Sequence, residues 1–181
     1  MLQASLCISS TTSSVRMERP RHLKRFSVSS NRIPKILDNT FIAAQVHGGD
    51  RSLLSNSAKV SDLLSAGDVH HIFPKEFLKK NGIDDKSMYN QVANYTYLDT
   101  GVNISIGKQS PQDYFTAALN QCATKELKVG TITENIALRD NLTVNCIPAD
   151  IFTMTAADYE KFLKERRILM AKKIKEYYSS L

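Results

Sequence analysis

Apolar residues return in groups along the chain, and their spacing predicts a series of helices separated by polar turns. The longest groups predict helices over residues 33–46 and 155–178, and shorter ones predict helices over 75–80, 102–107 and 136–142. The last helix repeats apolar residues at helical intervals, which predicts a buried stripe formed by Tyr159, Phe162, Leu163, Leu169, Met170, Ile174, Tyr177 and Tyr178. The same helix carries basic residues that we assign to its outer face, namely Lys161, Lys164, Arg166, Arg167, Lys172, Lys173 and Lys175.

Two short runs of β-branched and aromatic residues predict strands. The first covers Asp68–Phe73 and ends at Pro74, since proline has no N–H for a strand ladder. The second is Tyr95–Leu98. Two strands among many helices predict an α+β fold, in which a hairpin and a helix form a core surrounded by further helices.

Several helix boundaries are marked by residues that favour helix ends. Ser110 and Pro111 predict the start of a helix, with a capping hydroxyl followed by proline in the first turn. Gly82 is placed where a left-handed residue ends the helix over 75–80. For the helix over 102–107, we expect Thr100 to cap the start and Gly107 to mark the end.

Length and composition restrict the class of protein. A chain of 181 residues with 42% hydrophobic content is expected to form one globular domain with a core of its own. No apolar run is long enough to cross a membrane. The three cysteines include no Cys-x-x-Cys pair, so a zinc knuckle or a disulfide framework is not indicated, and we expect a cytoplasmic protein.

The net charge of +6 is confined to the start of the chain. Residues 1–37 hold seven Lys or Arg and one acid, so the remainder is balanced. Residues 1–31 are rich in Ser, Thr and Arg and lack periodicity, which predicts a disordered basic leader, although an organellar transit peptide has a similar composition. We therefore divide the chain into a leader over 1–37 and a domain over 38–181, and we do not interpret the charge as evidence for nucleic-acid binding by the domain.

Candidate chemistry is concentrated at the end of the first predicted strand. His70 and His71 are half of the four histidines in the chain. Side chains alternate between faces along a strand, so two adjacent imidazoles suit two different roles, one as a metal ligand and one as a base. Hydrolysis of a phosphodiester needs both, and an imidazole with an amide oxygen can hold Mg, Mn, Ni or Zn.

These residues resemble the HNH, or ββα-metal, endonuclease family. The resemblance is carried by Asp68-Val69-His70-His71-Ile72-Phe73-Pro74, then Asn94, then Asn103 followed by Gly107-Lys108, and the core covers residues 66–115. It implies that His71 is the general base, that His70 and Asn103 bind one divalent metal ion, and that Asn94 ties the intervening loop through main-chain hydrogen bonds. Asp68 orients an imidazole or caps a turn, and Lys108 contacts phosphate or is an ordinary surface lysine.

A longer resemblance links most of the chain from residue 40 to the nuclease domain of GmrSD-type modification-dependent restriction systems. It is carried by His-His-Ile-Phe-Pro-Lys, Asn-Tyr-Thr-Tyr-Leu-Asp, Asn-Ile-Ser-Ile-Gly-Lys and Ser-Pro-Gln-Asp-Tyr-Phe, and by the Phe-Leu-Lys-Glu-Arg-Arg segment of the last helix. It implies cleavage of foreign or modified DNA in phage defence. In such systems a ParB-like NTPase domain precedes the nuclease, and no Gly-rich phosphate loop of that kind occurs in this sequence.

Two functions are therefore expected. The first is a metal-dependent DNA endonuclease that acts with an NTPase or another DNA-reading partner. The alternative is a non-catalytic nucleic-acid-binding or regulatory module that keeps the HNH shape, or a nuclease that is inactive without its partner. A nuclease requires His71, whereas a binding module tolerates its loss.

Overall fold

The computed structural model describes residues 32–65 and 68–181. The predicted leader over residues 1–31 lies outside this part of the chain. Along the described chain, the α-helices and strands are α1 (Arg32–His47), α2 (Val60–Leu63), β1 (Asp68–His71), α3 (Lys75–Lys80), α4 (Lys86–Tyr89), β2 (Tyr95–Leu98), α5 (Thr100–Ile106), α6 (Pro111–Thr124), α7 (Asn135–Val144) and α8 (Tyr159–Ser179). Three short 3₁₀ helices are η1 (Val92–Asn94), η2 (Ile151–Thr153) and η3 (Ala156–Asp158). Helix α1 therefore begins inside the segment over 1–37 that we assigned to the leader.

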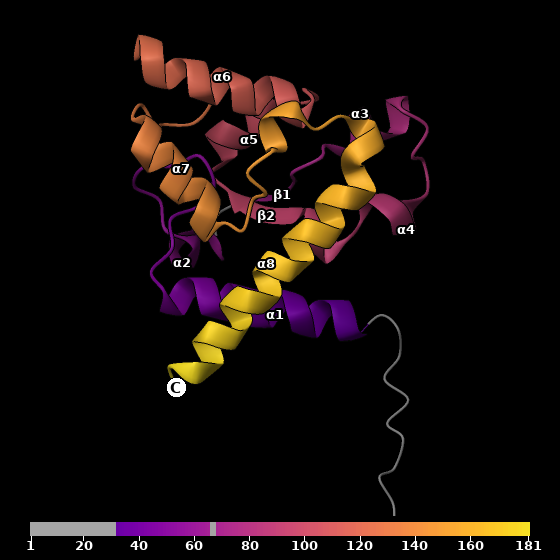
Figure 1. The fold of residues 1–181 in the computed structure, drawn as a ribbon, viewed down its shortest axis with the longest axis vertical. Coiled ribbons are helices and arrows are strands. Elements are labelled where there is room, and N and C mark those ends of the chain that lie inside the picture. Colours follow the sequence, from indigo (N-terminus) through magenta and orange to yellow (C-terminus); the bar gives the residue numbers. More distant parts are fainter. Residues whose placement is uncertain (1–31, 66–67) are drawn as a thin grey trace, which may run out of the picture.

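The fold is α+β, with one small sheet in a mainly helical domain. Strands β1 and β2 are antiparallel, and their register pairs His70 with Thr96 and His71 with Tyr95. Figure 1 shows the two strands near the middle of the molecule, with α5, α6 and α7 on one side and α1 on the other. Helix α8 crosses α1, against which it packs. The sheet is thus surrounded by helices, as the sequence predicts.

The first strand is shorter than predicted. It ends at His71, not at Phe73. The N–H of Ile72 donates to the main-chain carbonyl of Asn94 at 2.8 Å, and the N–H of Phe73 donates to the side-chain Oδ1 of Asn94 at 2.8 Å. The chain leaves the strand pairing because Asn94, which lies before β2, takes these two donors.

Most predicted helix ends are confirmed, with two exceptions. Helix α8 begins at Tyr159 and not at residue 155, since residues 156–158 form the separate 3₁₀ helix η3, and α5 begins two residues earlier than predicted. Ser110 caps α6 by accepting a hydrogen bond from the N–H of Asp113. Gly82 and Gly107 have positive φ angles of 84° and 54°, and each follows its helix closely. The prediction for α5 was wrong at its start, since Asp99 is the cap and accepts a hydrogen bond from Gly101, whereas Thr100 is already helical. A carboxylate is a favourable cap because it can satisfy an orphan N–H.

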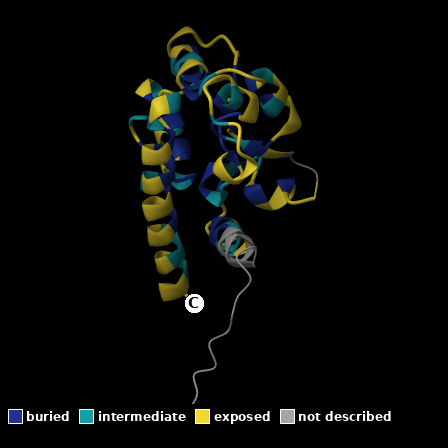
Figure 2. Ribbon diagram, turned by 90° about the vertical axis from the view of Figure 1, so that its right-hand side faces the viewer, coloured by how far each residue is buried: buried dark blue, intermediate teal, exposed yellow. Residues whose placement is uncertain are grey.

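The predicted faces of α8 need correction. Tyr159, Phe162, Leu163 and Met170 are buried as predicted, but Leu169 and Tyr178 are exposed. Arg166, which we had assigned to the basic outer face, is fully buried. Figure 2 shows the exposed side of α8 continuing along the helix to its C-terminal end. The fully buried part of the stripe therefore ends at Met170, and Ile174 and Tyr177 in the last turns are only half-buried.

Arg166 is buried among main-chain carbonyl groups. Its Nη1 donates to the carbonyl of Ala93 at 2.9 Å and to that of Tyr95 at 2.7 Å, and its Nη2 lies 3.4 Å from the carbonyl of Asn145. Arginine carries five N–H donors and remains charged, so several carbonyl groups are needed when it is buried. Helix α8 is in this way bound to η1 and to the first residue of β2.

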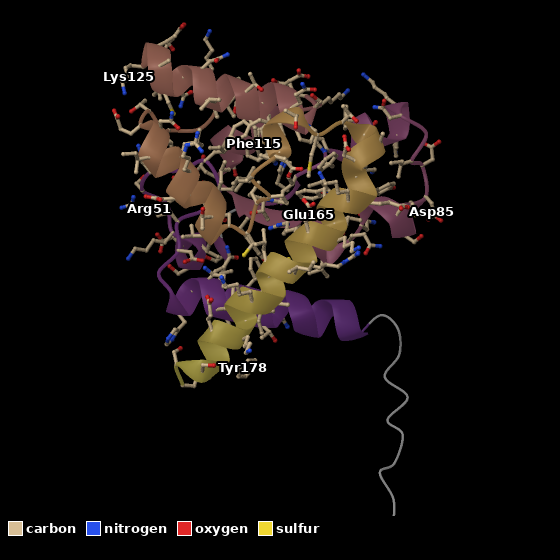
Figure 3. The ribbon with its side chains drawn as sticks, in the orientation of Figure 1. Arg51, Asp85, Phe115, Lys125, Glu165 and Tyr178 are labelled. Carbon is tan, nitrogen blue, oxygen red and sulfur yellow. The ribbon has the colours of Figure 1, made fainter. Side chains whose placement is uncertain are left out.

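The hydrophobic core lies between α6, α7, α8 and the strands. It includes Phe73, Leu98, Tyr114, Phe115 and Phe162, all of them fully buried. In Figure 3, Phe115 lies in the interior, whereas Asp85 and Tyr178 lie at the edge of the molecule. Among the described residues, no helix is both long enough and apolar enough to cross a membrane.

Candidate active site

His70 and Asn103 meet beside the sheet, although 33 residues separate them in the sequence. The Nδ1 of His70 lies 2.7 Å from the Oδ1 of Asn103. His70 is on β1, and Asn103 is in the first turns of α5, which packs against that strand. The sequence predicts these two residues as the metal ligands, and the fold brings a ring nitrogen and an amide oxygen together.

His70 is held as a neutral imidazole. Burial lowers the pKa of His70 from 6.5 to about 4, the hydrogen bond with Asn103 opposes that change, and the nearby His71 adds to it. The side chain is only 5% exposed, and the ring of Tyr114 packs edge-on against it with 6.4 Å between centroids. A neutral imidazole keeps one lone pair, which is the form that binds a metal ion. Because the amide oxygen of Asn103 only accepts hydrogen bonds, the contact puts the ring proton on Nδ1, and a metal ion held by both residues would require that proton to move to Nε2.

His71 occupies the next position of the strand and faces different neighbours. Its Nε2 lies 3.0 Å from the Oδ1 of Asn90, at the end of α4. The rings of Tyr95 and Tyr89 approach it edge-on, with centroids at 4.9 and 6.2 Å. The adjacent imidazoles therefore have separate partners, as expected from the alternation of side chains along a strand.

The half-buried position of His71 favours a base. Burial lowers the pKa of His71, the hydrogen bond with Asn90 opposes this change, and the ammonium group of Lys75 lowers the pKa further. The Nζ of Lys75 lies 5.8 Å from the centroid of the Tyr89 ring. A lowered pKa keeps the imidazole neutral at neutral pH, which is the form that accepts a proton from water. The Lys75 ammonium group contributes to this by lowering the affinity of the ring for a proton.

Asn94 binds the main chain on both sides of the loop that joins the strands. Its Oδ1 accepts from the N–H of Phe73, and its Nδ2 donates to the carbonyls of Phe73 and Tyr89, each at 3.1 Å. Asn94 is fully buried. These contacts correspond to the tying role that the resemblance implies, and they occupy the amide with main-chain groups.

Among the described residues, the structure shows no contact that assigns a role to the two supporting candidates, Asp68 and Lys108. Asp68 begins β1 opposite Leu98, but its side chain lies outside the described part of the structure. Lys108 is exposed and follows Gly107, which ends α5. In the described part of the chain, no hydrogen bond or ion pair joins Lys108 to the histidines.

Asn90 is the site residue that sequence reasoning missed. It falls in the polar loop before the second strand, where asparagine is common in turns. Its contact with His71 depends on how α4 folds against the strands, and we find no signal in the sequence alone that distinguishes it from Asn81 or Asn120.

Few charged ligands are available for a metal ion. Among the side chains that the structure describes, which do not include that of Asp68, no three from His, Cys, Asp or Glu form a group that could hold one. A metal ion at this site would therefore be held by His70 and Asn103, and water or phosphate oxygens would complete its shell. In a coordination shell of this kind, a phosphate oxygen of the substrate can take the place of a water molecule.

The chain matches no protein-family model, no curated protein and no solved structure.

Proposed function

We propose that the protein is a metal-dependent endonuclease of the HNH type that hydrolyses phosphodiester bonds in DNA. The observation that carries this proposal is the 2.7 Å approach of His70 to Asn103, beside His71 on the same strand. The order β1, β2, α5 along the chain supports the proposal, because a ββα-metal core consists of two strands followed by a helix. Asn94 closes the loop between the strands, as the resemblance implies.

Each residue has a role that its surroundings support. The neutral ring of His71 removes a proton from water, and the resulting hydroxide attacks phosphorus. The bond from phosphorus to the 3′ oxygen breaks, which leaves 5′-phosphate and 3′-hydroxyl ends. A divalent cation held by His70 and Asn103 would supply positive charge for the phosphate and for the leaving oxygen.

The charge of the domain favours dependence on a partner. The chain from residue 38 onwards carries no net formal charge, so long-range attraction to DNA is weak. The exposed lysines of α8 are interrupted by Glu160, Glu165 and Glu176. We infer that the substrate is foreign or modified DNA delivered by a DNA-reading partner, for which an NTPase subunit of the ParB-like kind is the candidate.

Cleavage of plasmid DNA tests this function. Plain and modified plasmids are incubated with the protein and with Mg, Mn, Ni or Zn, alongside His71→Ala and the matched control His47→Ala. His47 ends α1 and packs against Tyr177, away from the sheet. We expect metal-dependent nicking by wild type and by His47→Ala, and none by His71→Ala, although that variant still binds metal and DNA.

The same assay distinguishes the endonuclease from the alternative function, a non-catalytic binding module. A non-catalytic binding module would bind DNA without cleaving it under any metal, and His71→Ala would bind equally well. If His71→Ala cleaved DNA within a few-fold of the wild-type rate, His71 would not be the general base. At about 150 mM salt, where the Debye length is about 8 Å, rapid cleavage by the isolated chain at one defined sequence would contradict the need for a partner.

A further inference from the structure

Asn90 contacts the Nε2 of His71, which is the ring nitrogen of His71 with a protein partner among the described residues. Its Oδ1 lies 3.0 Å from Nε2. Among the hydrogen bonds of the described residues, none involves the Nδ1 of His71. An amide oxygen only accepts hydrogen bonds, so the contact requires the proton of the neutral ring to be on Nε2, and it leaves the lone pair on Nδ1.

We propose that Asn90 is a positioning residue for His71, which keeps the ring in the Nε2–H tautomer and makes Nδ1 the atom that accepts a proton from water. This inference rests on the proposed nuclease function, because only that function gives Nδ1 a proton to accept. Asn90 itself does not touch the reacting atoms in this proposal.

The main chain at Asn90 is fixed from two directions. Its N–H donates to the carbonyl of Lys86, which closes α4. The preceding carbonyl, that of Tyr89, accepts from Nδ2 of Asn94 at 3.1 Å, and the hydroxyl of Tyr159 donates to the carbonyl of Met88 at 3.0 Å. Asn90 is exposed as a side chain, but the peptide that carries it is bound to the loop and to α8.

The ring of His71 is also restricted in orientation. Tyr95, its partner across the strands, approaches edge-on at 4.9 Å, and Tyr89 does so at 6.2 Å. Two aromatic neighbours and one hydrogen bond define which edge of the imidazole faces Asn90. The opposite edge, with Nδ1, is then defined as well, which is what a general base needs for a fixed line of attack.

Two substitutions distinguish an accepting amide from a donating one. Asn90→Asp keeps an oxygen at this position and removes the NH₂ group, so it preserves the contact only if the amide accepts. Asn90→Ala removes the contact. Asn81→Ala is the matched control, because Asn81 is also an exposed asparagine that ends a short helix, and its Nδ2 donates to Phe77.

The tautomer is read from two-bond ¹H–¹⁵N correlations of the His71 ring in the full chain, at a pH at which the ring is neutral. The His71 signals are assigned by their loss in His71→Ala. We expect the Nε2–H form in wild type, Asn90→Asp and Asn81→Ala, and a mixture with the Nδ1–H form in Asn90→Ala. An Nδ1–H form in wild type, or an unchanged spectrum in Asn90→Ala, would overturn the proposal.

Cleavage kinetics give the second readout. Asn90→Ala is expected to lower kcat by about 10- to 100-fold with little change in KM, as for other groups that orient a reactive histidine. Asn90→Asp restores most of kcat, while its charge raises KM by repelling phosphate. A purely structural role would instead lower the stability of Asn90→Ala, and the aspartate would not rescue kcat.

The two readouts separate this inference from the function on which it rests. Absence of cleavage by wild type under every metal overturns the nuclease and with it the catalytic use of Nδ1, whatever the spectrum shows. Cleavage by wild type with an unchanged kcat in Asn90→Ala leaves the nuclease intact and rejects Asn90 as its positioning residue.

Discussion

The side chain of Asn94 and the main chain of Phe73 are joined by two hydrogen bonds. Phe73 donates its N–H to Oδ1 at 2.8 Å and accepts from Nδ2 at 3.1 Å. In a strand ladder, a residue both donates to and accepts from its partner. The amide of Asn94 provides the same two hydrogen bonds to Phe73, directly after β1 has ended. It fixes the exit of β1, and with it His71, relative to the start of β2.

We predict that Asn94→Ala lowers the free energy of unfolding by about 2–3 kcal/mol, because a buried N–H and two buried carbonyl groups lose a partner. Urea unfolding measures the change. Asn81→Ala, at an exposed asparagine, is the control and is expected to change stability by about 0.5 kcal/mol or less. Equal effects of the two substitutions would show that the buried contacts are replaced by other partners.

For Asn103→Ala, the expected result is weaker metal binding with an almost unchanged fold. One of the two protein ligands is removed, so the affinity for Mn or Ni is expected to fall by about tenfold or more. Calorimetric titration measures the affinity, and Lys108→Ala, at an exposed residue of the following loop, is the control. Unchanged affinity in Asn103→Ala would place the metal site elsewhere.

Arg166→Met is expected to destabilise the domain by about 3 kcal/mol, since charged hydrogen bonds to the carbonyl groups of Ala93 and Tyr95 are lost. The neighbouring Arg167→Met is the matched control. Arg167 donates at the surface to the side chain of Gln91, and such contacts contribute little. Thermal unfolding compares the two, and similar losses would argue against a special role for the buried guanidinium.

The pH dependence of stability reports on Asp50. Burial raises the pKa of Asp50 above its ordinary value of 3.8, although Lys173 at 2.6 Å opposes the change. A raised pKa means that the folded state holds this proton more tightly, so the contribution of Asp50 to stability falls as pH rises from the ordinary carboxyl range to the folded pKa.

Unfolding free energies of wild type and Asp50→Asn, measured from about pH 3.5 to pH 7, test this sign. The difference between them isolates Asp50 from other carboxyl groups, and the wild type is expected to lose stability relative to the variant as pH rises. Lys173→Met, which removes the cation, is expected to enlarge that loss. A difference that does not change with pH would contradict the raised pKa.

Much of the fold follows from local patterns. Tyr95–Leu98 forms the predicted strand because alternating aromatic and β-branched residues fit a half-buried ladder. Ser110 and Pro111 begin α6 because a capping hydroxyl followed by proline in the first turn favours a helix start. Where a signal depends on a few neighbouring residues, the sequence predicts the element, while the exact first residue differs in α5 and α8.

Features that depend on distant residues were not predictable in this way. Arg166 reads as part of a basic surface because nothing near it in the sequence shows the carbonyl groups that it meets across the fold. The end of β1 is set by Asn94 and not by the residues of the strand. The contact of Asn90 with His71 likewise needs the packed position of α4.

Arg166 has a consequence for the lifetime of the folded state. Its bond to Tyr95 joins residues 71 apart in the sequence, whereas Asn94 and Phe73 are separated by 21. Contacts between distant residues tend to form late in folding, and changes to late contacts act mainly on the rate of unfolding. We therefore expect Arg166→Met to refold at nearly the wild-type rate but to unfold many times faster. In this way the guanidinium group lengthens the time for which β2 and α8 remain joined.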